Sequence, residues 1–96
     1  MKIILDPGHG GKFPGAVNGR LGLQEKTVAL AYSLALRTQL LKAGHAVRMT
    51  REDDRHLAEY RGADLAVRVA IANAWVPDLF LSIHCNAAEA INANGI

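Results

Sequence analysis

Cysteine, aromatic residues and long apolar stretches are scarce in this chain of 96 residues, and each shortage excludes a class of protein. The single cysteine, Cys85, cannot form an internal disulfide, so the fold is not a disulfide scaffold. No stretch approaches the ~18–20 consecutive apolar residues of a membrane span, so we expect none. Few aromatic side chains are present that could stack on nucleic-acid bases. The charged side chains sum to +2, and residues of both signs are scattered along the chain. The sequence therefore predicts no nucleic-acid binding.

The first residues do not have the pattern of a secretory signal. Only Lys2 precedes the short apolar run of residues 3–5, and Asp6 ends that run. We therefore expect no signal peptide, and the sequence does not predict a compartment.

The length and composition are typical of one small globular domain. Half of the residues are apolar and 21% are charged, which excludes disordered and highly charged classes of protein. At this length roughly 60–68% of the surface of the unfolded chain is buried on folding, so the loss of a neighbouring element would affect stability.

Two helices are predicted from the pattern of apolar residues. Residues 24–42 are strong helix formers, and Gly44 stands where a helix commonly ends. Because polar Lys26, Ser33 and Arg37 share one face and nearly all other faces are apolar, we expect most of this helix to be covered. A second helix, ended by Pro77, is predicted from apolar residues at helical spacing. These residues are Leu65, Val69, Ala72 and Val76.

Three strands alternate with these helices. The apolar runs 2–5 and 78–84 and the alternating residues 45–50 predict them, and Asp6-Pro7-Gly8 is expected to form a turn after the first. This order predicts an α/β fold, with a parallel twisted sheet and helices on both faces. If the first strand is central, the carboxyl ends of the first and third strands meet at one edge, where α/β proteins bind ligands.

A glycine-rich loop joins the first strand to the first helix. Its concentration of glycine up to Gly22 is typical of a functional loop on a rigid scaffold. The loop matches neither a dinucleotide-binding nor a phosphate-binding motif, because Phe13 replaces the last glycine of the first and no Ser or Thr follows Lys12.

Three potential metal ligands, His9, Glu25 and His84, are expected at this edge of the sheet. Two imidazoles and one carboxylate are a typical catalytic zinc set, which leaves a fourth position for water. Spacing alone does not establish the site, since no short metal motif such as HExxH is present. A carboxylate favoured by the helix dipole remains an alternative for Glu25, and a buried core histidine remains one for His84.

Several motifs, in order along the chain, carry a resemblance to a known family. They are Leu5-Asp6-Pro7-Gly8-His9-Gly10-Gly11, Glu25-Lys26, Thr50-Arg51, Leu65 with Arg68, Ala72-Asn73, and the segment from Asp78 to Ala87. Together they resemble the motifs of zinc-dependent N-acetylmuramoyl-L-alanine amidases, the peptidoglycan hydrolases of bacterial autolysins and phage endolysins. The resemblance spans residues 2–87 and implies that His9, Glu25 and His84 bind Zn2+.

The resemblance also implies a reaction, which is hydrolysis of the amide between N-acetylmuramic acid and L-alanine of peptidoglycan. In the family, the glutamate that acts as general acid and base lies in a carboxyl-terminal part, which we expect beyond Ile96. No catalytic residue of this kind is identified in the chain, because Glu52, Glu59 and Glu89 are expected to be surface charges. We therefore expect residues 1–96 to be the amino-terminal portion of a single amidase catalytic domain. The alternative is a catalytically silent fragment that binds zinc or cell wall.

Three local features leave further expectations. Residues 52–64 are longer than the usual link of the family and are expected to form a surface insertion. Cys85 stands where the family usually has a smaller residue. Because adjacent strand residues point to opposite faces, Cys85 is expected to be an inert buried thiol and not a fourth zinc ligand. Asp6 either forms a turn before Pro7 or orients a metal ligand without itself contacting the metal ion. An unpaired sheet edge is also expected, which predicts self-association.

Overall fold

The centre of the molecule is a parallel sheet of three strands in the order β4–β1–β5. The computed structural model describes residues 1–85, and in it β1 (Lys2–Pro7) pairs with both β4 (Ala46–Met49) and β5 (Leu79–Ile83). The central position predicted for the first strand is confirmed. Because the pairing is parallel, β1 and β5 end at the same edge of the sheet.

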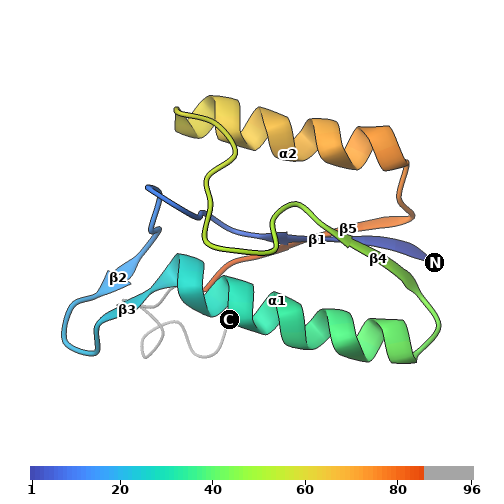
Figure 1. Ribbon diagram of the computed structural model, residues 1–96, viewed down its shortest axis with the longest axis horizontal. Coiled ribbons are helices and arrows are strands. Elements are labelled where there is room, and N and C mark those ends of the chain that lie inside the picture. Colours follow the sequence, from blue (N-terminus) through green and yellow to red (C-terminus); the bar gives the residue numbers. More distant parts are fainter. Residues whose placement is uncertain (86–96) are drawn as a thin grey trace.

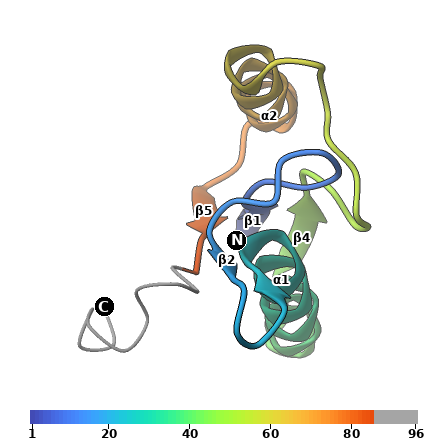
Figure 2. The same cartoon turned by 90° about the vertical axis from the view of Figure 1, so that its left-hand side faces the viewer.

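One helix lies over each face of this sheet (Figures 1 and 2). α1 (Glu25–Lys42) runs along one face and is followed by Gly44, as predicted, while α2 (Arg61–Trp75) lies over the other. Val76, in a left-handed conformation with φ 52, separates α2 from Pro77. The predicted α/β fold is confirmed. Within residues 1–85, neither helix has the length and apolar character needed to cross a membrane.

Small side chains bring α1 close to the sheet. Leu5 of β1 and Ala29 of α1 are completely buried. Ser33, expected on a polar face, is also buried, and its hydroxyl donates to the carbonyl oxygen of Ala29 at 2.7 Å. The expectation that most of α1 is covered is wrong, since Tyr32 and Leu41 are 59% and 51% exposed. Within residues 1–85, the narrow sheet covers one side of α1, and the other side is exposed.

The buried side of α2 is not the apolar stripe that predicts this helix. Leu65 and Val69 are more than half exposed, whereas Asp64, Arg68 and Ala72 are buried. The reason is electrostatic, because β1 carries a buried carboxylate that needs a cationic partner, and α2 supplies it by turning Arg68 inward. Of the apolar stripe, only Ala72 is buried, and Leu65, Val69 and Val76 remain exposed in the described part of the chain.

β1 continues beyond the position where a turn is predicted. Asp6 and Pro7 remain in the ladder, paired with Ser82 and Ile83 of β5. The N–H of Gly8 then donates to the carbonyl oxygen of Ile83 at 2.8 Å. The expectation of a turn at residues 6–8 is therefore wrong, because pairing with a strand distant in sequence extends β1.

β5 is less covered than its apolar sequence predicts. Leu79 and Phe80 are 40% and 37% exposed. Within residues 1–85, β5 pairs with β1 on one side and has no strand on the other, so it is an edge strand. The expected unpaired edge is thus present in this part of the chain, and self-association through it stays a prediction.

The glycine-rich loop contains a small hairpin that the sequence pattern does not predict. β2 (Val17–Asn18) and β3 (Leu23–Gln24) pair in antiparallel fashion and lead directly into α1 (Figure 1). The hairpin therefore determines where the first residue of α1 stands relative to the sheet.

Residues 52–64 brace the glycine-rich loop. The Asp54 carboxylate accepts hydrogen bonds from the N–H of Gly11 at 2.8 Å and from the Lys26 ammonium group at 2.9 Å. The segment lies largely at the surface, as expected, and in addition it holds the loop against the start of α1.

Candidate metal centre

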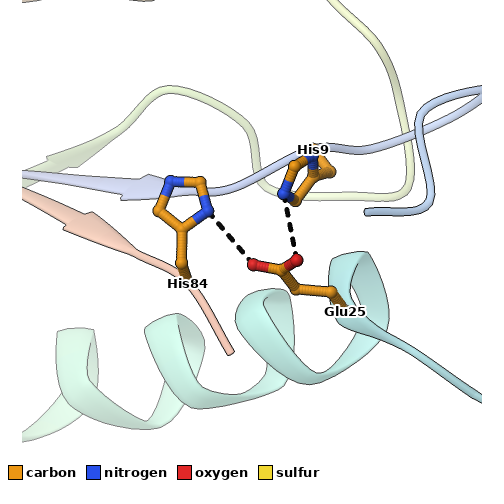
Figure 3. A group of neighbouring side chains, drawn as sticks. All are labelled: His9, Glu25 and His84. Atoms are coloured by element: carbon orange, nitrogen blue, oxygen red, sulfur yellow. Dashed lines mark hydrogen bonds and ion pairs between the residues drawn. The ribbon is translucent and has the colours of Figure 1, made fainter. Parts of the chain in front are cut away.

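Side chains from three separate parts of the chain meet at the carboxyl-terminal edge of the sheet (Figure 3). His9 follows β1, His84 follows β5, and Glu25 is the first residue of α1. Glu25 Oε1 lies 3.1 Å from His9 Nε2, and Glu25 Oε2 lies 3.1 Å from His84 Nδ1. The imidazole centroids are 5.2 Å apart, with the ring planes at 83°. The convergence predicted from topology is therefore present.

This cluster of His9, Glu25 and His84 could hold a metal ion. One ligand atom from each residue lies within 4.8 Å of the other two. A tetrahedral zinc ion with bonds of ~2.0–2.1 Å holds its ligand atoms about 3.4 Å apart, so the cluster fits such an ion with small adjustments. Two imidazoles and one carboxylate leave a coordination position open, which is typical of catalytic sites.

The protonation states of the cluster suit metal binding. Burial lowers the pKa of His9, and the Glu25 carboxylate raises it by less, so this imidazole is neutral at neutral pH. Burial raises the pKa of Glu25, but hydrogen bonds from the N–H groups of Ala16 and Cys85 and the nearby imidazoles bring it below its usual value. A neutral imidazole and an ionised carboxylate are the forms that bind metal ions.

Two buried arginines hold the turn that carries His9. Arg68 donates to the carbonyl oxygens of Pro7 and His9. Arg51 donates to those of Pro7 and Gly8, at 3.1 and 2.8 Å. His9 has φ 64, a conformation uncommon for a residue with a side chain. Because three successive carbonyl groups are fixed, the backbone keeps this conformation and directs the His9 ring into the cluster.

Ser82 and Asp6 lie on the side of the His84 ring that faces away from Glu25. His84 Nε2, on the far side of the ring from Glu25, is 3.0 Å from Ser82 Oγ, which donates to Asp6 Oδ2 at 2.9 Å. Asp6 therefore supports a candidate ligand and forms no turn, which decides between its two alternatives. The sequence pattern does not single out Ser82, although strand alternation places it on the same side of the chain as His84.

The structure contradicts the alternative for His84, whereas the first-turn position in the alternative for Glu25 is present together with the contacts to both imidazoles. Glu25 does stand in the first turn of α1, but it is 7% exposed and each of its oxygens faces an imidazole. The His84 side chain is 50% exposed, so it is not a core histidine.

Cys85 takes part through its backbone. Its N–H donates to Glu25 Oε2 at 3.0 Å, while its thiol is outside the cluster of ligand atoms found within residues 1–85. Burial and the Glu25 charge raise the pKa of this thiol, so it remains protonated at neutral pH. The structure favours the inert thiol over the fourth ligand, but Cys85 is half-buried and not buried as predicted.

The other carboxylates considered from the sequence lie away from the cluster. Glu52 pairs with Arg37 at 2.5 Å, and Glu59 pairs with Lys12 at 2.7 Å, both with largely exposed side chains. They are surface charges, as predicted. Glu89 lies outside the described residues.

Known proteins are similar to this chain along almost all of its length. The family model described as N-acetylmuramoyl-L-alanine amidase matches residues 3–96. The sporulation-specific N-acetylmuramoyl-L-alanine amidase of Bacillus subtilis is 44% identical over 89 residues, which are 91% of this chain and 32% of that protein. The amidase AmiC of Neisseria meningitidis is 43% identical over 93 residues, which are 97% of this chain and 21% of AmiC.

A solved structure gives the same result. The CwlD amidase of Clostridioides difficile, in complex with the GerS lipoprotein, superposes with a TM-score of 0.80 at 38% identity, over 90% of this chain and 48% of CwlD. The chain thus spans about a fifth to a third of the two curated relatives and about half of CwlD. Since both sequence and fold match, this chain belongs to the N-acetylmuramoyl-L-alanine amidase family.

Proposed function

We propose that this chain is part of a zinc-dependent peptidoglycan hydrolase that cleaves the amide between N-acetylmuramic acid and L-alanine. The observation that carries the proposal is the cluster of His9, Glu25 and His84, whose ligand atoms lie within 4.8 Å of one another. The family alone supports the choice of bond, because the geometry itself favours metal-assisted hydrolysis without selecting a substrate.

In this proposal the chain supplies three ligands and an open approach to them. Bound zinc would polarise the scissile carbonyl and lower the pKa of a water molecule bound to it to about 7. Glu25 is kept ionised and oriented by the N–H groups of Ala16 and Cys85. Both imidazoles line a hollow between the β1 edge and α2, with Phe13 and Arg61 on its wall. A substrate can therefore reach the cluster from the α2 side.

A second candidate function is zinc and cell-wall binding without turnover. Within residues 1–85, Glu25 is the only carboxylate in the cluster. Asp6 and Asp64 line the nearby hollow, but both pair with Arg68 at 2.9 and 2.8 Å and are not free to transfer protons. A silent module lacking a general acid and base is consistent with this arrangement.

Dye-labelled peptidoglycan distinguishes the two functions. The hydrolase predicts dye release that stops when a chelator is added and returns with added zinc, because the ion activates the attacking water. Binding to the labelled cell wall without release would support the silent module. Elemental analysis of protein purified without chelator should find bound zinc, and a chain free of metal would contradict both functions.

Gly15 provides a steric test of the proposed zinc site. A Cβ at Gly15 would lie 2.5 Å from His9 Cδ2 and 2.6 Å from Glu25 Oε1. The Gly15→Ala variant should therefore displace two ligands and weaken zinc binding about tenfold or more, measured by competition with a chromophoric chelator.

Gly22→Ala is the matched control. Gly15 and Gly22 have φ of +70° and +67°, so alanine strains the backbone equally at both positions, by about 1–2 kcal/mol. A Cβ at Gly22 meets nothing within 4 Å, so this variant should lose stability and keep its zinc affinity. Equal zinc affinities in the two variants would show that the residues around Gly15 do not bind the ion.

A further inference from the structure

A chain of two hydrogen bonds runs from His84 into the protein core. His84 Nδ1 faces Glu25, and His84 Nε2 points away from Glu25 (Figure 3). The Ser82 hydroxyl lies 3.0 Å from His84 Nε2 and 2.9 Å from Asp6 Oδ2. The half-exposed imidazole is thereby connected to a buried carboxylate.

Asp6 sets the direction of these hydrogen bonds. It is 5% exposed, and its Oδ1 accepts from the Thr50 hydroxyl at 2.7 Å and from the Arg68 guanidinium at 2.9 Å. A carboxylate paired with a guanidinium is an acceptor only. The hydroxyl proton of Ser82 is therefore donated to Asp6, and the Ser82 oxygen is left to accept from His84.

We propose that Ser82, held by Asp6, is a positioning residue that keeps a proton on His84 Nε2 and thereby presents the Nδ1 lone pair to a metal ion. This role rests on the proposed zinc site. Ligating histidines commonly donate their other N–H to an acceptor that fixes the tautomer and the ring orientation. Here Ser82, two residues before His84 in the sequence, provides that acceptor, and Ser82 in turn donates to the buried Asp6 carboxylate.

The role of Ser82 follows because a proton and a metal ion compete for the lone pair of His84 Nδ1. Without the hydroxyl, the ring loses its contact behind Nε2, and Nδ1 can carry the proton and donate it to Glu25, 3.1 Å away. A protonated Nδ1 has no lone pair for a metal ion. Zinc binding would then have to displace this proton and reorient a ring that is half exposed.

Removing the hydroxyl tests the proposal. The Ser82→Ala variant of the whole chain should bind zinc about 10–100-fold more weakly in competition with a chromophoric chelator. Ser82→Thr retains a hydroxyl on the same strand and should keep most of the affinity. Ser33→Ala removes a buried hydroxyl that bonds within α1, so it should leave zinc affinity unchanged.

Proton NMR of the cobalt-substituted chain gives a readout that a general loss of stability would not imitate. The exchangeable Nε2–H of His84 should be observed in the wild type and in Ser82→Thr. It should be lost to solvent exchange in Ser82→Ala, while the ring C–H signals of His9 remain shifted by the bound cobalt.

Two results would overturn the proposed role, and they can be told apart. Wild-type zinc affinity in Ser82→Ala, or a persistent Nε2–H signal in that variant, would refute the role of Ser82 and leave the zinc site intact. A wild-type chain that binds no zinc would refute the zinc site itself, and the role of Ser82 with it.

Discussion

Replacing Arg68 with methionine should lower the free energy of unfolding by about 3–5 kcal/mol, a large share of the ~5–15 kcal/mol of a typical domain. Methionine keeps much of the side-chain volume but removes the charge. It leaves Asp6 and Asp64 buried beside each other without their shared guanidinium, and the carbonyl oxygens of Pro7 and His9 lose a donor. Urea unfolding followed by circular dichroism measures the loss.

Arg55→Met is the matched control for this variant. Arg55 also pairs with an aspartate, Asp53 at 2.5 Å, but both side chains are largely exposed. An exposed ion pair contributes little because water solvates each charge almost as well as the partner does. The free energy of unfolding should therefore remain close to that of the wild type. A similar small loss in Arg68→Met would show that the buried pairs do not hold α2 on the sheet.

Glu25→Gln should weaken zinc binding by about 10²–10³-fold. Four-ligand zinc sites bind with about 10–16 kcal/mol, or about 2.5–4 kcal/mol per ligand, and each 1.4 kcal/mol is a factor of ten. The amide removes the negative charge between the two imidazoles. It also replaces one of the two oxygens that accept from Ala16 and Cys85 with a donor. Chelator competition measures the affinity.

Glu59→Gln makes the same chemical change at the surface. Glu59 pairs with Lys12 and has a largely exposed side chain away from the cluster, so its variant should bind zinc as the wild type does. Near-normal zinc affinity in Glu25→Gln would mean that the ion binds elsewhere, and the proposed function would lose its central observation.

The positions of His9, Glu25 and His84 could be predicted because they depend on topology. Apolar runs and helical spacing are local properties of a sequence, and parallel strands joined by helices place their carboxyl ends at one edge. Parallel topology therefore suffices to bring together His9 just after β1, His84 just after β5, and Glu25 at the start of α1. The resemblance to a family then added zinc and a substrate, which spacing did not supply.

The features that could not be predicted depend on partners distant in the sequence. The polarity of Asp6 favours a turn, and the exposed Ser82 has no local sequence feature that links it to Asp6. Their pairing across β1 and β5 instead extends the strand and supports His84 from behind. The inward side of α2 likewise follows Arg68, because a buried carboxylate on the sheet is stabilised more by a guanidinium than by leucine or valine.

The order of helices and strands, the parallel sheet and the edge where the candidate ligands gather were determined by the sequence itself. The tertiary structure alone decided which side of each helix is buried, how far β1 extends and which nitrogen of His84 faces Glu25. The physical reason is that periodicity records the average environment of a segment, whereas buried polar groups are satisfied one hydrogen bond at a time by whatever residue the fold places beside them.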